Sequence, residues 1–314
     1  MTPESANLNL TKASTTLSFA AGPTKTAHRL TDAETAEVLS FLGERALHTF
    51  VMSGFIRDNG LESERNRGRF YGYRDQDGTL AGVALIGHAT FVEAQHDKAF
   101  RELAIVAQES PRIHMILGEE ETVERFRRHY TPAGQRLRHV CREVLFGLNN
   151  VDPDFKSMPE LRLATLNDLC LVAPVQAALA CEESGVNPLE SDRRGFLQRC
   201  QRRIELNRCW VWRETDELIF KADIISETPQ VIYLEGIYVA DDRRGEGIGS
   251  RCLSQMARTL LKRANAIVVL VNEHKRETQN FFQRVGFTRR AFYQTQFLEV
   301  AQGEAENLAL SQSA

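Results

Sequence analysis

The spacing of apolar residues changes along the chain, and each change marks a predicted element. Residues 231–239, VIYLEGIYV, are rich in β-branched and aromatic residues and predict a strand. From Ile248 the apolar residues recur every three or four positions, which predicts an amphipathic helix. A second apolar run at 267–271 predicts a buried strand, and the short helix after it ends at Gly286.

The first half of the chain shows a similar order. Thr31 and Glu34 have the spacing of a capping box, so we expect the structured region to begin there. Further elements are expected as helices at 36–42, 48–56, 96–107 and 119–130, a hairpin of strands 69–73 and 80–91 turned at Asp77 and Gly78, a strand at 113–117 and two strands between 135 and 148. After a linker at 149–159 we expect a strand at 161–164, helices at 165–180 and 190–205, strands at 209–213 and 218–225, and a last strand at 290–300.

These patterns predict a mixed α/β (α+β) fold in two domains, for which 314 residues are sufficient. We expect a flexible tail at 1–30, an N-terminal domain at 31–150, a second domain at 159–301 and a polar tail at 302–314. The net charge of −3 gives no electrostatic reason to expect nucleic acid or membrane as a partner.

Cysteine and histidine usage points to a protein of the cytoplasm without a metal. The six cysteines form no C-x-x-C pair, and the histidines match no zinc spacing. The N-terminus lacks the pattern of a signal peptide, and the longest apolar run, 80–92, is too short to cross a bilayer. We therefore expect a soluble cytoplasmic protein.

The segment between strand 231–239 and the following helix carries the strongest chemical signal. It reads R-x-x-G-x-G from Arg244 to Gly249 and follows Arg243. Glycines that lead into a helix N-terminus present free backbone N–H groups to one point, where the helix dipole also favours an anion. A Rossmann site would need G-x-G-x-x-G and a P-loop would need G-K-[ST], and neither is present. A loop whose glycines serve only to turn the chain leaves the paired arginines unexplained.

This arrangement resembles the acyl-CoA loop of the GCN5-related N-acetyltransferase (GNAT) family. The end of the chain strengthens the resemblance, because residues 282–287, FQRVGF, are similar to the Y-x-x-x-G-F ending of that family. Phe282 departs from the pattern, since it stands where the family has tyrosine. The resemblance implies tandem GNAT-like domains, each a mixed, mostly antiparallel sheet flanked by helices.

The whole chain is similar to a two-domain GNAT subgroup with a DUF4081-type N-terminal domain. In the first half the equivalent junction, 91–97, reads FVEAQHD and contains neither glycine nor arginine. We therefore expect a degenerate N-terminal domain without a phosphate cradle, beside a second domain that binds acyl-CoA.

The resemblance also implies which residues hold the donor, acetyl-CoA. The thioester would lie where strands 231–239 and 266–271 separate, the backbone of Ile237 and Val239 would hold the pantetheine arm, and the N–H groups of 244–250 would hold the pyrophosphate. The residues expected to bind the cofactor are Ile237, Tyr238, Val239, Arg243, Arg244, Gly245, Glu246, Gly247, Ile248, Gly249, Ser250, Asn272 and Phe282. Asn272 is equally well explained as a turn residue at a strand end.

Glu235 and Tyr293 are the first candidates for proton transfer. Glu235 is a carboxylate in an apolar strand, two residues from Ile237 and therefore on the same face, which suits a general base. Pairing with an arginine on the sheet face explains it equally well. Glu182 and Glu183 are second candidates, between the first two helices of the second domain, although a solvated loop explains them better. Phe282 cannot donate a proton, so Tyr293 or water would protonate the thiolate, although Tyr293 also fits an ordinary half-buried tyrosine.

The expected activity is an N-acyltransferase that moves an acetyl group from acetyl-CoA to an amine of a small molecule or amino-acid derivative. A non-catalytic regulator that binds acyl-CoA is the alternative, which Phe282 favours and Glu235 opposes. Aminoacyl transfer from tRNA is a third interpretation, against which the glycine loop and the lack of a basic face argue. The oligomeric state is open, with a homodimer as one option.

Overall fold

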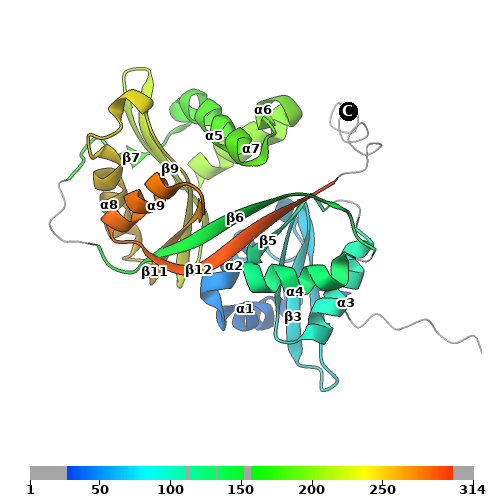
Figure 1. Ribbon diagram of the computed structural model, residues 1–314. Helices are drawn as coiled ribbons and strands as arrows, with labels where there is room; N and C mark the ends of the chain where they lie inside the picture. The colour runs from blue at the N-terminus through cyan, green and yellow to red at the C-terminus, as the bar shows by residue number, and fades with distance from the viewer. Residues whose placement is uncertain (1–26, 111–112, 132, 152–156, 300–314) are drawn as a thin grey trace, which may run out of the picture.

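A computed structural model describes residues 27–110, 113–131, 133–151 and 157–299 (Figure 1). We call 27–148 the N-terminal half and 157–299 the C-terminal half. The N-terminal half contains β1 (Ala27–Arg29), α1 (Thr35–Gly43), α2 (Ala46–Asn59), β2 (Gly68–Arg74), β3 (Leu80–Gly87), β4 (Ala89–Ala94), α3 (Asp97–Gln108), β5 (Met115–Glu119), α4 (Glu120–Tyr130) and β6 (Leu137–Leu148). The C-terminal half contains β7 (Arg162–Leu163), α5 (Leu169–Ser184), α6 (Pro188–Ser191), α7 (Arg193–Glu205), β8 (Cys209–Glu214), β9 (Glu217–Glu227), β10 (Val231–Val239), α8 (Ile248–Leu260), β11 (Ala266–Asn272), α9 (Arg276–Val285) and β12 (Thr288–Leu298).

The strands form one continuous sheet in the order β1-β2-β3-β4-β5-β12-β6-β11-β10-β9-β8-β7. At the centre of the sheet the two halves exchange strands. The last strand, β12, lies between β5 and β6 of the N-terminal half. Strand β6, which ends the N-terminal half, pairs in turn with β11 of the C-terminal half. These two long strands run side by side from one half into the other (Figure 1). The sheet is mixed and mostly antiparallel, as predicted.

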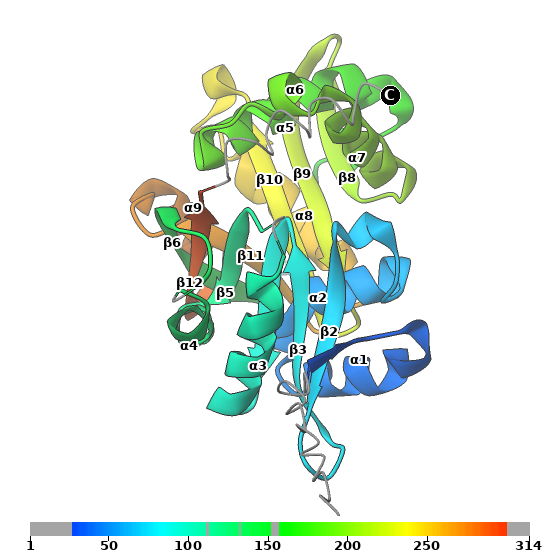
Figure 2. The same cartoon turned by 90° about the vertical axis from the view of Figure 1, so that its right-hand side faces the viewer.

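Two layers of helices cover the C-terminal part of the sheet. On one face, α8 and α9 pack on a core that includes Val144 of β6 and Val271 of β11. On the other face, α5 and α7 pack on β8 and β9, and α2 reaches across from the N-terminal half (Figure 2). Phe50 and Val51 of α2 belong to one apolar cluster with Tyr233 of β10.

Close polar contacts fix the position of α2 on the C-terminal half. Ser226 on β9 donates from its Oγ to the carbonyl of Phe50 at 2.5 Å. Arg208 Nη2 lies 2.8 Å from Asp58 Oδ1 at the end of the same helix. Gly54 lies directly over Ser226, so a side chain there would collide with it. The helix therefore has a fixed position over β9 and β10.

Most predicted elements are present, and four predictions need correction. The capping box of Thr31 and Glu34 is confirmed, and Gly286 ends α9 in the left-handed region. The predicted strand 80–91 is two strands, because the chain turns back at Gly87, where a Cβ would meet the carbonyl of Arg67. The two strands predicted between 135 and 148 are the single strand β6, which neighbouring strands pair on both sides.

The other corrections concern the chain ends and one loop. Strand β1 lies within the segment predicted as a tail, while residues 1–26 and the tail at 302–314 lie outside the described residues. Glu182 and Glu183 lie in the last turn of α5 rather than in a loop, because that helix continues to Ser184. The domain bounds themselves stay a prediction.

Candidate functional site

A gap opens in the sheet between β10 and β11. The two strands pair in parallel only where Val231–Tyr233 lie beside 266–268. Beyond this point β10 bends at Gly236, whose φ is +60°, and its register with β9 shifts between Glu235 and Tyr238. A bulge of this kind turns a strand away from its neighbour. The sequence prediction of a separation between these strands matches this geometry.

A buried charge network holds the bulge. Lys221 on β9 is fully buried, and its Nζ donates to Asp223 Oδ2 at 2.7 Å, to Gln176 Oε1 at 2.7 Å and to the Gly236 carbonyl at 3.3 Å. Arg203 adds a second cation 2.6 Å from Asp223. Burial would raise the pKa of Asp223, but Lys221 and Arg203 outweigh it and keep the pKa lowered. The bulge therefore depends on an ion pair in the interior.

The glycine loop forms an open cradle at the N-terminus of α8. Gly245 and Gly247 have φ of +87° and +76°, and Gly247 is the N-cap. No described residue accepts a hydrogen bond from the backbone amides of 245–250. A Cβ on Gly245 or Gly247 would meet no described atom within 4 Å, so space remains beside these amides. The cradle suits a phosphate group, because the free amides can donate hydrogen bonds to it and the helix dipole favours its negative charge.

The side chains around the cradle divide into surface and core. Arg243 binds Glu214 at 3.0 Å and Glu246 at 3.4 Å, and Arg244 binds Asp241 at 2.6 Å. These carboxylates offset the two arginines, so the free amides and helix terminus are the main attraction for an anion. The buried part of the loop is Ile248 and Gly249, and Ser250 is half-buried.

The remaining predicted cofactor residues lie on both sides of the gap. Ile237, Tyr238 and Val239 are half-buried at the end of β10, beyond the bulge. The prediction that Glu235 and Ile237 share a face is wrong, because the extra residue of the bulge puts Tyr238 on the face of Glu235, and Ile237 packs against the core beneath α8. Asn272, at the end of β11, uses Nδ2 toward Cys141 Sγ at 3.3 Å and Oδ1 to accept from the His274 amide at 2.9 Å. Its role as a strand-end turn residue is thus confirmed, and a contact with pantetheine stays a prediction.

Phe282 belongs to the core rather than to an open surface. It is 4% exposed and packs its ring against Phe146, Phe281 and Phe287. Phe282 carries no hydroxyl, and its ring is part of the apolar core beside α9. A role for Phe282 in holding the cofactor stays a prediction.

Three carboxylates from different elements meet near the gap. Glu235 is exposed, and the Tyr233 hydroxyl donates to its Oε1 at 2.5 Å. Burial, and secondarily the charge of Glu235, raise the pKa of Glu143 on β6 to about 7. Part of Glu183 on α5 is exposed to solvent. Its carboxyl group is nevertheless largely surrounded by protein, and this burial, together with the charges of Glu235 and Glu143, raises its pKa to about 8. Glu182, by contrast, pairs with Lys275 at the surface.

Glu143 is a functional candidate that was not predicted from the sequence. In the sheet it lies directly opposite Asn272 of β11 and Tyr293 of β12, so these three side chains share one face. The sequence offers one signal, a carboxylate at the start of the apolar run EVLFGL. The pairing of β6 with β11 and β12 is what brings it to the gap.

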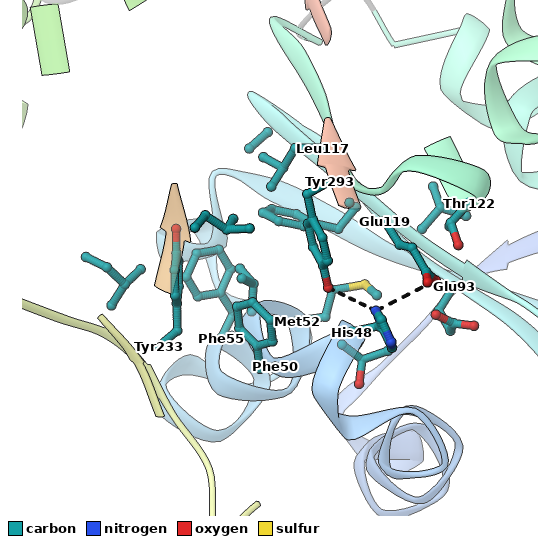
Figure 3. Close-up of a pocket in the computed structure, with 18 of the residues that line it drawn as sticks. His48, Phe50, Met52, Phe55, Glu93, Leu117, Glu119, Thr122, Tyr233 and Tyr293 are labelled. Carbon is teal, nitrogen blue, oxygen red and sulfur yellow. Dashed lines mark hydrogen bonds and ion pairs between the residues drawn. The ribbon is translucent and has the colours of Figure 1, made fainter. Parts of the chain in front are cut away.

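A cavity of about 140 Å³ lies on this face, between α2 and the sheet (Figure 3). Both halves line it, with His48, Glu93 and Glu119 from the first and Glu235 and Tyr293 from the second. Most of the other lining residues are apolar: Phe50, Val51, Met52, Phe55, Ala89, Phe91, Val92, Leu117, Ile225 and Leu270. Thr49, Gly118, Thr122 and Tyr233 complete the walls. The structure thus brings the two predicted catalytic residues, Glu235 and Tyr293, to one cavity.

Tyr293 makes its polar contacts with the N-terminal half. It is 3% exposed, and its hydroxyl lies 3.1 Å from His48 Nδ1 and donates to the Leu47 carbonyl at 3.4 Å. Burial, with the nearby Glu119, raises the pKa of Tyr293 well above its usual value. The tyrosine is therefore buried and hydrogen-bonded, and a role as proton donor stays a prediction.

The N-terminal half repeats the order of elements without the cradle. Strands β4 and β5 also pair in parallel for two residues only, Ala89 and Thr90 with Met115 and Ile116. At the start of α3, however, the His96 side chain caps the helix by accepting from the Ala99 amide at 3.3 Å. The position that an anion occupies in a glycine loop is thus filled by a side chain.

Within the parts of the chain that the structure covers, no helix has the length and apolar character needed to cross a membrane. Among the same residues, no three His, Cys, Asp or Glu side chains are grouped so as to hold a metal ion.

Comparison with known proteins agrees with this geometry. Residues 175–287 match the model of the acetyltransferase (GNAT) family, and no curated protein sequence matches the chain. A Drosophila protein of known structure has a TM-score of 0.64 at 14% identity and covers 88% of this chain and 99% of its own. A tandem GNAT protein from the clavulanic acid biosynthesis pathway has a TM-score of 0.53 at 12% sequence identity, and the match covers 86% of this chain and 98% of that protein. A GCN5-related N-acetyltransferase from Sphaerobacter thermophilus has a TM-score of 0.52 at 13% sequence identity, and the match covers 87% of this chain and 95% of that protein. The chain therefore has a tandem GNAT-like fold, while the DUF4081-type identity of its first domain stays a prediction.

Proposed function

We propose that this chain, whose residues 175–287 form a GNAT acetyltransferase domain, transfers an acetyl group from acetyl-CoA to the amine of a small molecule. The observation that carries the proposal is the cradle of free amides at 245–250, placed beside the gap between β10 and β11. The cradle suits the diphosphate of coenzyme A, and the gap gives the pantetheine arm a path to the face where Glu235 lies.

The chemistry required of the protein is the removal of a proton from the amine. An alkyl amine has a pKa of about 10.4, so forming the free amine at pH 7 costs about 4–5 kcal/mol. A carboxylate at the gap can accept this proton directly or through water. We assign this role to Glu235, which lies on the bulged strand and is open to solvent.

Glu143 and Glu183 support this assignment. Their raised pKa values, about 7 and about 8, allow each to exchange a proton near neutral pH. The carboxylate of Glu235 attracts a protonated amine, and Glu143 and Glu183 provide a route for the proton that the amine loses. Proton donation to the departing thiolate is assigned to Tyr293 or to water.

A regulator that binds acyl-CoA without turning it over is the second candidate. The observation that favours it is Phe282, which fills the core where the family places a hydroxyl. The two functions share the cradle and differ only in turnover, so one pair of measurements separates them.

The test is thiol release from acetyl-CoA with a panel of amines, beside a binding titration with coenzyme A. Glu235→Gln should lower kcat by about 10²–10³-fold and leave CoA affinity unchanged, because it removes only the base. Glu217→Gln, an exposed carboxylate on β9, is the matched control and should behave as the wild type. CoA binding without turnover of any amine would support the regulator, and unchanged turnover in Glu235→Gln would remove Glu235 from the mechanism.

A second variant tests the cradle. Gly247→Ala places a methyl group beside the free amides at a φ of +76°, and it should weaken CoA binding by about tenfold. Gly185→Ala, with a φ of +74° and equally open surroundings outside the loop, controls for backbone strain. Equal CoA affinity in both variants would contradict the assignment of the diphosphate to this loop.

A further inference from the structure

We propose that the cavity between α2 and the sheet is the acceptor site, and that it takes a primary amine on a compact apolar body that carries no carboxylate. The inference rests on the proposed acyltransfer and names its substrate class. The cavity lies on the same face as the candidate base, and Tyr233 and Glu235 form part of its wall. An amine held there would have its nitrogen at Glu235 and its body between α2 and the sheet.

The size and walls of the cavity define the body of the acceptor. A volume of about 140 Å³ is comparable to that of an engineered apolar cavity that binds benzene. Much of the wall is apolar, with Phe55 from α2, Leu117 from β5 and Leu270 from β11. Such a space favours a ring or a branched alkyl group of that size, attached to the amine by a short chain.

The charges around the cavity select against a carboxylate. Among the described residues, the titratable side chains on the cavity wall are His48, Glu93, Glu119, Glu235 and the two tyrosines, and no lysine or arginine lines it. Arg45, just outside, already binds both Glu93 and Glu119. A carboxylate in the cavity would therefore face three acidic groups without a free cation to pair with.

His48 does not change this conclusion. Burial lowers the pKa of His48 despite the opposing charge of Glu119 3.7 Å away, which favours the neutral ring. Its Nδ1 is also engaged with the Tyr293 hydroxyl. An ammonium group finds the favourable environment in this cavity, and an α-amino acid does not.

The acceptor site is a joint product of the two halves. The first half contributes lining residues from α2, β4, β5 and α4, and the second half contributes them from β9 to β12. The N-terminal half, in which His96 caps α3 and no cradle forms among the described residues, thus contributes the part of the site that selects the amine.

The test compares phenethylamine with L-phenylalanine, which share a ring and differ by a carboxylate. With acetyl-CoA, we expect kcat/KM for phenethylamine to exceed that for phenylalanine by at least about a hundredfold. Leu117→Phe enlarges a side chain of the cavity wall and should raise the KM for phenethylamine by about tenfold, with CoA affinity unchanged. Leu166→Phe, at an exposed leucine remote from the cavity, is the control and should leave both constants unchanged.

The outcomes separate this inference from the proposed function. Turnover of amines with equal use of phenylalanine, or a phenethylamine KM unaffected by Leu117→Phe, would overturn the acceptor site and leave acyltransfer standing. If the wild type turns over no amine, calorimetry of phenethylamine binding decides the point. Binding that Leu117→Phe weakens would support the cavity as an amine site in a protein that is not an acyltransferase, and no binding would reject both.

Discussion

The bulge at Gly236 offers the sharpest test of how the fold builds the site. Gly236→Ala would place a methyl group 2.5 Å from Gln176 Oε1 and 2.7 Å from Lys221 Nζ, at a φ of +60°. Neither neighbour can move freely, because Lys221 is fully buried and already holds Asp223 and the Gly236 carbonyl. The variant must therefore shift the strand or break the buried network.

The expected loss of stability has two parts. The left-handed backbone costs about 1–2 kcal/mol for a residue with a Cβ. The collision with two fixed side chains adds about 1–3 kcal/mol, as overpacking does in other interiors. The free energy of unfolding should fall by about 2–5 kcal/mol in total, measured by urea titration.

A second glycine isolates the collision from the backbone strain. At Gly78, whose φ is +84°, an added Cβ would meet no described atom within 4 Å, so Gly78→Ala should cost only the strain. Gly236→Ala should also lower thiol release, because Glu235 adjoins the bulge. If Gly236→Ala is no more destabilising than Gly78→Ala, the argument that Lys221 and Gln176 fix the bulge is refuted.

Two further predictions concern groups on the face of the gap. The pKa of Glu143 is raised from 4.5 to about 7, so the folded state binds more protons between these values and its stability falls as the pH rises from 5 to 8. Glu143→Gln removes the titrating group, so between pH 5 and 8 its free energy of unfolding should rise by up to about 2–3 kcal/mol relative to that of the wild type. If the free energies of unfolding of the two proteins change with pH in parallel, Glu143 is not buried as described. Tyr293→Phe should destabilise the protein by about 1 kcal/mol through its lost hydrogen bonds. If Tyr293 protonates the thiolate, kcat of Tyr293→Phe should also fall by about tenfold or more, with unchanged CoA affinity. Tyr71→Phe serves as the control. An unchanged kcat in Tyr293→Phe would mean that water protonates the thiolate.

The local part of the fold could be predicted from the sequence because short-range rules determine it. The strand 231–239, the glycine loop and the helix from Ile248 were predicted from residue type and spacing, and the structure has them as β10, loop and α8. The turn at Gly78 and the capping box at Thr31 depend on contacts within a few residues. The donor side of the site follows from these elements alone, since the cradle consists of backbone groups in one continuous segment.

The exchange of β6 and β12 could not be predicted in this way. The apolar pattern of a strand shows that it is buried but does not name its neighbour, and a pairing between residues far apart in the chain leaves no local signal. The sequence therefore placed β12 within the second domain, whereas the structure sets it between two strands of the first half.

The sequence by itself determined the cradle, because the glycines that free its amides and the helix that orients them are neighbours in the chain. Only the tertiary structure decided the acceptor side. Glu143 meets Glu235 through the pairing of β6 with β11, and the cavity exists because α2 crosses from one half to cover the sheet of the other. Its walls come from helices and strands of both halves, and their meeting depends on long-range packing that no segment specifies alone.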